Sequence, residues 1–304
     1  MASITLKKIQ STATIISLKV FLQMFQCLPR WCTHAIFAVL FPMAYFGIRQ
    51  LVGICRKNLY RVYGGSKTPK DYNTMTRSCF KEMGHAMLDM LYFVRRPKAL
   101  KDITRIHGED HLRDALDKQR GAVVVTAHLG NFPLMFLSLV SLGYKVNVVI
   151  RSMRDKEFSR FMYDLCALWG IRMLETLPQR TFLKEALTAL HRNELLVILL
   201  DEVVPPQEGV QVSFLGTEVT RGTGPMLFHQ RTGSDIVPMF IAQDSEKYFQ
   251  IFIEPALKIE GGSDAQETTR NHIVQLTQIT ESYIRQYPTQ WGGWLNKRWI
   301  SQGA

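Results

Sequence analysis

The chain has 304 residues, of which 46% are hydrophobic and 21% charged, so it can bury a substantial core and is not an intrinsically disordered protein. Its net charge of +11 is unevenly distributed. Residues 1–70 contain ten Lys or Arg and no Asp or Glu, whereas the other 234 residues contain 27 basic and 26 acidic side chains. Because the N-terminal basic residues are spread through apolar sequence, the charge favours an anionic membrane surface as a partner and argues against nucleic acid.

Residues 3–62 are predicted to form two or three helices, with breaks near Leu28-Pro29 and at Pro42. Residues 31–48 contain no Lys, Arg, Asp or Glu and have about the minimum length for a bilayer span. His34 and Pro42 argue against a span. We therefore expect a helix that dips into or lies along the membrane interface, with a true span and a core-packed helix as the alternatives.

A loop at residues 64–69 is predicted to precede a helix at residues 71–94. Five sulfur-containing side chains recur near helical spacing in this helix: Met75, Cys79, Met83, Met87 and Met90. Such a stripe usually packs in a core, although Met also suits the wall of an acyl-binding pocket. The five cysteines of the chain show no C-x-x-C spacing and no metal-ligand pattern, which predicts reduced thiols in a cytosol-facing protein.

From about residue 103 onward, strand and helix patterns alternate along the chain. Strands are predicted at residues 103–106, 122–126, 146–150, 173–174, 195–200, 210–214, 236–242 and 249–253. Helices are predicted at residues 109–118, 132–142, from the strand ending at 150 through 169, 179–191, 225–232 and 267–286. The alternation predicts an α/β fold with a mixed, largely parallel central sheet flanked by helices, preceded by an N-terminal apolar helical membrane anchor. Residues 1–62 are expected to form the membrane-associating helices and residues 70–300 the α/β domain.

His128 follows the buried strand at 122–126 and is followed by Gly130 and Asn131. Pro133 suits the first turn of the next helix, and Asn131 can cap that helix. A histidine at the end of a strand and just before a helix N-terminus is well placed to act as a general base beside an anion. The alternative is a structural histidine bonded to the main chain.

Charged residues also follow two neighbouring predicted strands. Arg151 ends the strand at 146–150, and its guanidinium suits a phosphate or carboxylate. Asp201 and Glu202 follow the apolar run at 195–200, where a carboxylate would orient and charge-stabilise His128. The alternatives are a surface arginine and ordinary turn residues before the next prolines.

The segment Arg221-Gly-Thr-Gly-Pro225 is predicted to be a flexible loop before a helix, and it would form a cradle for an anion or a carbonyl. In a parallel sheet, the carboxyl ends of the strands meet at one edge. We therefore expect His128, Arg151 and Asp201 to converge there on one catalytic site.

The order of these motifs resembles the late acyltransferases of bacterial lipid A biosynthesis, the lauroyl/myristoyl type, within the lysophospholipid acyltransferase superfamily. The resemblance spans roughly residues 70–300. The segments that carry it are Thr126-Ala-His-Leu-Gly-Asn-Phe132, Val149-Ile-Arg151, Leu199-Leu-Asp201, Gly209-Val-Gln-Val-Ser-Phe-Leu-Gly216, Thr223-Gly-Pro225, Val237-Pro238 and Trp294-Leu-Asn-Lys-Arg-Trp299.

The resemblance implies acyl transfer from an acyl carrier protein thioester or acyl-CoA to a hydroxyl of a lipid A precursor or related membrane glycolipid. It implies no metal or redox cofactor, and a location at the cytosolic face of the bacterial inner membrane. His128 would be the general base, Asp201 would assist it, and donors at the start of the following helix would hold the oxyanion. The substrate-binding residues would be Asn131, Arg151, Glu202, Thr223 and Gly224.

Pro133 departs from the family pattern, in which an acidic residue stands five positions after the histidine. Proline carries neither a charge nor a side-chain hydrogen-bonding group and cannot orient His128. Two explanations are open. Either Asp201 or Glu202 takes the carboxylate role, or the chain is a weakly active or inactive member that binds a lipid or an acyl carrier.

Overall fold

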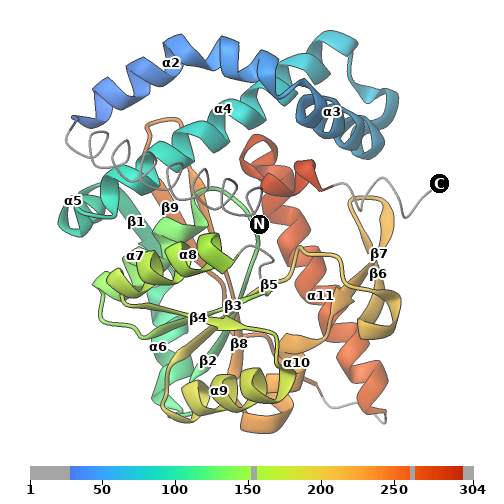
Figure 1. The fold of residues 1–304 in the computed structure, drawn as a ribbon. Helices are drawn as coiled ribbons and strands as arrows, with labels where there is room; N and C mark the ends of the chain where they lie inside the picture. The colour runs from blue at the N-terminus through green and yellow to red at the C-terminus, as the bar shows by residue number, and fades with distance from the viewer. Residues whose placement is uncertain (1–27, 152–155, 261–263, 297–304) are drawn as a thin grey trace, which may run out of the picture.

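The computed structural model describes residues 28–151, 156–260 and 264–296, which contain one large seven-stranded sheet between layers of helices (Figure 1). The strand order is β1-β9-β8-β2-β5-β3-β4. Strands β8, β2, β5, β3 and β4 run parallel, while β9 and β1 run in the opposite direction. The strands are β1 (Thr104–His107), β2 (Ala122–Thr126), β3 (Val146–Ile150), β4 (Ile171–Glu175), β5 (Leu195–Leu199), β8 (Asp235–Gln243) and β9 (Phe249–Ile253). The predicted α/β fold with a largely parallel sheet is confirmed.

The central strands are apolar on both faces because helices cover both faces. Side chains of β2 alternate between two hydrophobic cores, with Val123 and Val125 in one core and Ala122 and Val124 in the other. The first core includes side chains of α9 (Gln179–His191), α10 (Gly224–Thr232) and α11 (Ala265–Gln286). The second core includes side chains of α6 (Glu109–Asp117), α7 (Phe132–Ser141) and α8 (Lys156–Leu168).

Three helices near the N-terminus form the upper layer in Figure 1: α2 (Arg30–Gly47), α3 (Arg49–Tyr63) and α4 (Pro69–Phe93). A capping box between Thr68 and Asp71 begins α4. Helices α2 and α4 pack closely where Phe37 of α2 meets Gly84 of α4. A Cβ atom on Gly84 would lie 2.1 Å from the Phe37 ring. The two helices are also joined by an ion pair between Arg30 and the buried Asp89 at 2.7 Å.

The prediction of a helix break at Pro42 is wrong, because Pro42 lies inside α2. The chain bends instead by 84° between α2 and the helical segment that follows Ile48. The predicted helix before Leu28 lies outside the described residues.

No single helix in the described part of the chain is long and apolar enough to cross a membrane. The bent pair formed by Arg30–Gly47 and Arg49–Ser66 is long and apolar enough to cross a membrane only when both halves are taken together. One side of α2 is nevertheless unusually apolar for an exposed surface. Trp31, Val39, Met43 and Phe46 are each between 73% and 77% exposed.

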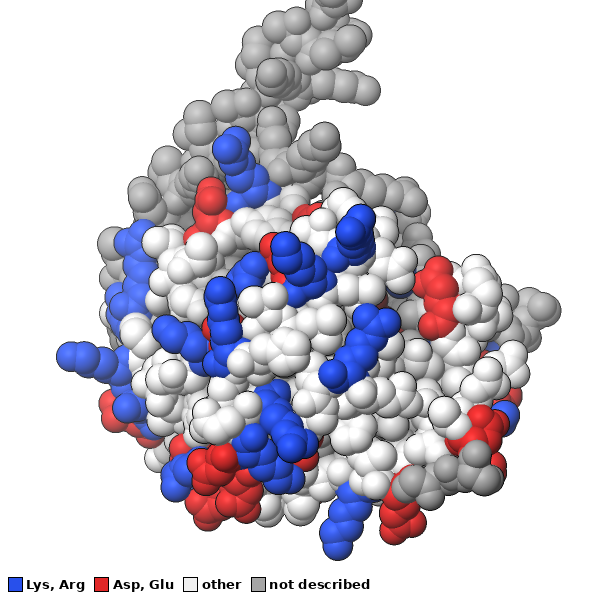
Figure 2. Space-filling view, turned by 90° about the horizontal axis from the view of Figure 1, so that it is seen from below, with Lys and Arg blue, Asp and Glu red and all other residues white. Residues whose placement is uncertain are grey.

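The opposite end of the molecule has a different surface (Figure 2). Lys and Arg side chains are spread over this end, and Asp and Glu side chains lie mainly near its edges. A surface with charges of both signs is typical of contact with water. The exposed apolar side chains of α2 therefore distinguish the upper layer from this end.

Three elements, two strands and a short helix, differ from the sequence-based expectation. Residues 210–214 were expected in the central sheet, but β6 (Gly209–Phe214) pairs only with β7 (Thr217–Gly222), in a separate antiparallel hairpin. Leu215 and Gly216 have φ values of 51° and 74°, and a two-residue turn of this kind folds a strand back onto the next segment. A short helix, α5 (Pro97–Asp102), also precedes β1.

Candidate active site

The carboxyl ends of β2 and β5 place His128 and Asp201 opposite each other. Thr126 and Leu199 are register partners in these parallel strands, and His128 and Asp201 each come two residues later. The pairing continues past the strands, because the main-chain N–H of Leu200 donates to the carbonyl of Thr126 at 2.9 Å. The two side chains are therefore aligned by the sheet itself.

Asp201 bonds to the same histidine residue twice. Its Oδ1 is 3.0 Å from His128 Nδ1, and its Oδ2 accepts the main-chain N–H of His128, also at 3.0 Å. The Asp201 side chain is only 2% exposed, whereas that of His128 is 36% exposed. A carboxylate accepts from Nδ1–H, so the acceptor nitrogen of neutral His128 is Nε2.

The pair shifts the pKa values of both groups in opposite directions. Desolvation lowers the pKa of His128, but the charge of Asp201, its hydrogen bond and the charge of Glu202 outweigh this and raise the pKa above 6.5. Burial raises the pKa of Asp201, but the charge of His128 and the hydrogen bonds from His128 and Trp291 outweigh burial and lower it below 3.8. Each partner thus favours the charged form of the other.

Trp291, which the sequence did not single out, and Arg221, the first residue of the predicted loop at 221–225, hold Asp201 from other sides. The indole N–H of Trp291 donates to Asp201 Oδ2 at 2.8 Å, and a guanidinium N–H of Arg221 donates to the Asp201 main-chain carbonyl at 2.6 Å. Both side chains are 1% exposed. Burial lowers the pKa of Arg221 to about 10, so Arg221 remains a cation at neutral pH. The alternation Thr217, Val219, Arg221 is the sequence signal that would have placed Arg221 on the buried side of a strand.

The segment after His128 is attached to the C-terminal part of the chain. The N–H of Gly130 donates to the Gln290 carbonyl at 2.9 Å, and the N–H of Gly292 donates to the His128 carbonyl at 2.8 Å. Gly130 has a φ of 55°, and a Cβ atom there would lie 2.3 Å from the Ile241 carbonyl oxygen. Glycine is required at this close crossing.

His128 opens into a cavity of about 1150 Å³ along the edge of the sheet. Asp201, Glu202 and Asn131 also line the cavity, together with Gln243, Gln290, Gly292, Gly293 and Asn296. Helices α4, α7 and α8 and the start of β9 supply the apolar lining residues: Met83, Ala86, Met87, Leu88, Met90, Leu91, Phe132, Pro133, Met162, Leu165, Leu168 and Phe249. Such a cavity can hold an apolar chain beside a polar reacting group.

The other sequence-predicted site residues are not all in this cavity. Glu202 lines it and lies 4.0 Å from Arg151. Among the described residues that line the cavity, Arg151, Thr223 and Gly224 do not appear. Thr223 and Gly224 begin α10, and a Cβ atom on Gly224 would contact Ile198 rather than His128. The predicted flexible loop at 221–225 is partly strand, since Arg221 and Gly222 belong to β7.

Asn131 lines the cavity and stands at the N-cap position of α7, as predicted, but its side chain makes no capping hydrogen bond there. Its Nδ2 donates to the Ala86 carbonyl of α4 at 2.7 Å, so the side chain joins α7 to α4. Pro133 lies in the first turn of α7, as expected, and lines the cavity. The carboxylate beside His128 is that of Asp201.

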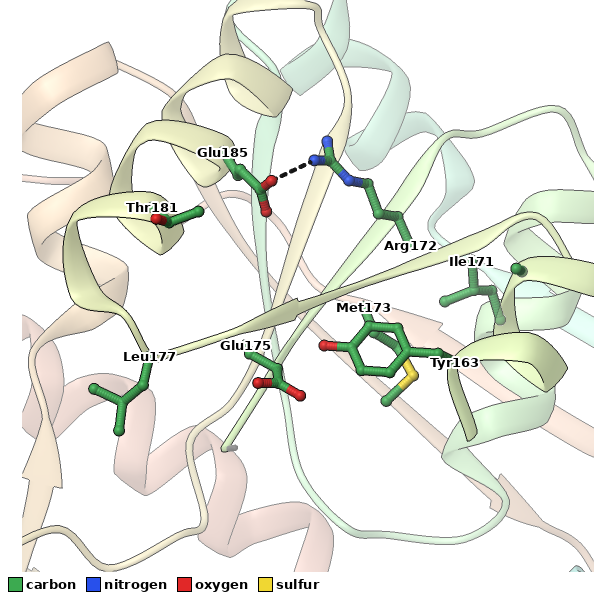
Figure 3. Close-up of a pocket in the computed structure, with 9 residues that line it drawn as sticks. Tyr163, Ile171, Arg172, Met173, Glu175, Leu177, Thr181 and Glu185 are labelled. Atoms are coloured by element: carbon green, nitrogen blue, oxygen red, sulfur yellow. Dashed lines mark ion pairs between the residues drawn. The ribbon is translucent and has the colours of Figure 1, made fainter. Parts of the chain in front are cut away.

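A second, smaller cavity of about 390 Å³ lies around the sheet-edge strand β4 (Figure 3). Arg172 and Glu185 form an ion pair at 3.2 Å across it. Burial and a hydrogen bond to Glu175 raise the pKa of Tyr163 to about 12. None of the site residues predicted from the sequence lines this cavity among the described residues.

Comparison with known proteins gives one family and two relatives. The family described as bacterial lipid A biosynthesis acyltransferase matches residues 5–301. A phosphatidylinositol mannoside acyltransferase of Mycobacterium tuberculosis (strain ATCC 25618 / H37Rv) is 25% identical over 250 residues, covering 81% of this chain and 76% of the relative. A protein of the same description from strain CDC 1551 / Oshkosh is 25% identical over 197 residues, covering 64% of this chain and 60% of that relative. The chain therefore belongs to the bacterial lipid A biosynthesis acyltransferase family and is an acyltransferase.

Proposed function

We propose that the protein transfers a fatty acyl chain from a thioester donor to a hydroxyl of a membrane glycolipid, with His128 as the general base. The observation that carries this proposal is the hydrogen bond between His128 and the buried Asp201 at the wall of the large cavity. His128 Nε2 takes the proton of the acceptor hydroxyl as its oxygen attacks the thioester carbonyl carbon. The C–S bond then breaks, and the leaving thiolate takes the proton from His128 to give the ester and a free thiol.

The main-chain N–H groups at the start of α7 are proposed to hold the oxyanion of the tetrahedral intermediate. Gly130 and Gly292 cannot do so, because their N–H groups already donate to main-chain carbonyls. Pro133 has no N–H. Among the hydrogen bonds of the described residues, the N–H groups of Asn131 and Phe132 have no acceptor, which leaves them for this role.

The substrates are proposed from the cavity and from the relatives. The apolar wall formed with α4, α7 and α8 suits the acyl chain, and the polar residues around His128 suit the acceptor. The relatives are phosphatidylinositol mannoside acyltransferases, so a glycolipid such as a lipid A precursor is the proposed acceptor class. Acyl carrier protein or CoA is the proposed carrier of the donor. Arg151 and Glu202 lie together near the cavity and are proposed to contact the acceptor.

The exposed apolar side of α2 is proposed to contact the membrane on the cytosolic face of the bacterial inner membrane. Tryptophan and other large apolar side chains favour the lipid interface, and the Lys and Arg residues of residues 1–70 favour anionic lipid. In this proposal residues 1–62 form the membrane-associating part and residues 70–300 the acyltransferase part. The cavity lies beside α4, on which α2 packs, so a lipid acceptor would enter from the membrane side.

An inactive binding protein is the competing function, suggested by Pro133. The geometry favours an enzyme, because Asp201 supports His128 without a carboxylate at position 133. The test measures transfer of a labelled acyl group from acyl carrier protein and from CoA to a panel of glycolipids, with products identified by mass spectrometry. The proposal expects transfer by the parent and none above background by His128→Ala. Binding of lipid or carrier without transfer by the parent would support the competing function.

A further inference from the structure

The C-terminal segment supplies one of the three N–H groups that bond to the Asp201 carboxylate. Two of them, the main chain of His128 and the indole of Trp291, donate to Oδ2 at 3.0 and 2.8 Å. His128 Nδ1 lies at Oδ1. Two donors on one oxygen fix the rotation of the carboxylate, and this leaves the other oxygen directed at the imidazole.

The ring of Trp291 is itself held in place. It makes edge-to-face contacts with Trp294 at 4.8 Å and Phe214 at 5.7 Å, measured between ring centroids. A Cβ atom on Gly293 would lie 2.1 Å from the Trp291 ring, so the absence of a side chain at Gly293 leaves the space that the ring occupies. Arg221 stacks on the same Phe214 ring at 4.1 Å and bonds to the Asp201 main chain. These contacts therefore hold the indole N–H against Asp201 Oδ2.

We propose that Trp291 is a positioning residue for acyl transfer, whose indole N–H fixes the Asp201 carboxylate against His128. This inference rests on the proposed role of His128 as the base. It assigns a task to a residue about 90 positions after Asp201 in the sequence. It also explains how Asp201 stays aligned with His128 without a carboxylate at position 133, since the Trp291 indole and a main-chain N–H orient the Asp201 side chain.

Trp294 provides a matched control for Trp291. Both tryptophans are 1% exposed and belong to one aromatic cluster, but the Trp294 indole donates to the Pro288 carbonyl and not to Asp201. Trp291→Phe removes the N–H and keeps most of the ring. We expect Trp291→Phe to lower kcat by about tenfold to a hundredfold with KM for both substrates within about twofold, as for loss of a hydrogen bond to a charged group. Trp294→Phe is expected to leave kcat within about threefold.

Two further readouts separate positioning from general destabilisation. In an Asp201→Asn background, Trp291→Phe is expected to cost less than about threefold, because residues that act as a unit are not additive. NMR titration of the His128 imidazole does not depend on turnover. A loosened carboxylate attracts the imidazolium less, so the pKa of His128 is expected to fall towards 6.5 in Trp291→Phe and to stay unchanged in Trp294→Phe.

Three outcomes would each overturn the positioning role. The first is an equal loss of kcat in the two tryptophan variants, and the second is an unchanged pKa of His128 in Trp291→Phe. The third is a loss of kcat from Trp291→Phe that is as large in the Asp201→Asn background as in the parent. Failure of the base itself is distinguishable in the same assay. If His128→Ala keeps the parent's rate, the proposed function fails. If His128→Ala is inactive and Trp291→Phe retains the parent's rate, only the role of Trp291 fails.

Discussion

At the scale of single residues, one buried carboxylate accepts from two nitrogen atoms of the same histidine. Asp201 thereby fixes both the main chain and the imidazole of His128, which is more than a side-chain contact alone would achieve. The opposite pKa shifts of the two groups follow from their mutual attraction, which exceeds the desolvation cost for each. As the proposed base, His128 would be neutral, and therefore active, only above its raised pKa.

Asp201→Asn is expected to lower kcat by about three to four orders of magnitude, the usual cost of losing an orienting acid. The pKa of His128 is expected to fall, because the largest influence that raises it is removed, so the acid limb of the kcat/KM profile moves to lower pH. Glu202→Gln should move this limb in the same direction by less, since Glu202 is the smaller influence. A larger effect of Glu202→Gln would assign the supporting carboxylate to Glu202 instead.

Stability should also depend on pH through this pair. The contribution of His128 is present below its unfolded pKa and is lost as pH rises through the raised folded value. The contribution of Asp201 is present above its unfolded pKa and is lost as pH falls through the lowered folded value. The free energy of unfolding lost in His128→Ala should therefore be greater at about pH 5.5 than at about pH 8.5. Urea unfolding at both values measures it, and a reversed order would contradict the assigned shifts.

Pro133→Glu tests whether the missing family carboxylate limits this protein. Position 133 lies in the first turn of α7, and His128 Nδ1 is already bonded to Asp201. We expect the substitution to change kcat by less than about tenfold, a small step against the cost of losing an orienting acid. Strong activity created in an inactive parent would show instead that the parent is a binding protein.

At the scale of elements, the packing of α2 on α4 depends on the absence of a side chain at Gly84. A Cβ atom there would overlap the Phe37 ring, so Gly84→Ala should destabilise the protein by about 1–3 kcal/mol. Gly53 in α3 is the matched control, because nothing lies within 4 Å of a Cβ atom at that position. Gly53→Ala should stabilise by about 0.5–1 kcal/mol. Denaturant unfolding of both variants gives the two signs, and equal signs would contradict this packing.

The exposed side of α2 makes a second prediction at this scale. Met43→Glu together with Phe46→Glu replaces two exposed apolar side chains of the proposed membrane contact with negative charges. Binding to vesicles of anionic lipid should therefore weaken by about tenfold or more. Leu177→Glu is the control, since Leu177 is 63% exposed but lies at the β4 cavity and not on α2. Unchanged vesicle binding by the α2 variant would place the main membrane contact elsewhere in the protein.

Sequence patterns predicted some elements better than others, for physical reasons. Apolar runs bounded by turn residues gave β2, β3 and β9 with their observed ends, because these strands are buried on both faces. The pairing of β6 with β7 depends on a two-residue turn with positive φ at Leu215, which periodicity does not report. The helix α2 continues through Pro42 because α2 packs on α4, and the sequence pattern does not show this tertiary contact.

The candidate site shows the same division. His128 and Asp201 were predictable because each follows a buried parallel strand, and register alone brings them together. Trp291 was not predictable from the sequence, because its contact with Asp201 depends on how residues near position 291 return to the sheet. Nor do strand patterns show that α10 directs Gly224 towards Ile198 rather than into the cavity.

At the scale of the whole molecule, the sheet, the upper helices and the C-terminal segment meet at one cavity. The sheet supplies His128 and Asp201, α4 supplies much of the apolar wall, and residues 290–296 line the other side. The cavity adjoins the upper layer, in which α2 exposes its apolar side, at the far end from the charged surface of Figure 2. This arrangement suits a reaction between a lipid acceptor and a water-soluble acyl carrier.

The most direct test of the central claim follows a labelled acyl thioester in vesicles that contain a glycolipid acceptor, with the parent and His128→Ala compared at equal amounts of folded protein. The account predicts an acylated glycolipid and a stoichiometric free thiol with the parent, and no product above background with His128→Ala. Equal rates of product formation by the two proteins would contradict it.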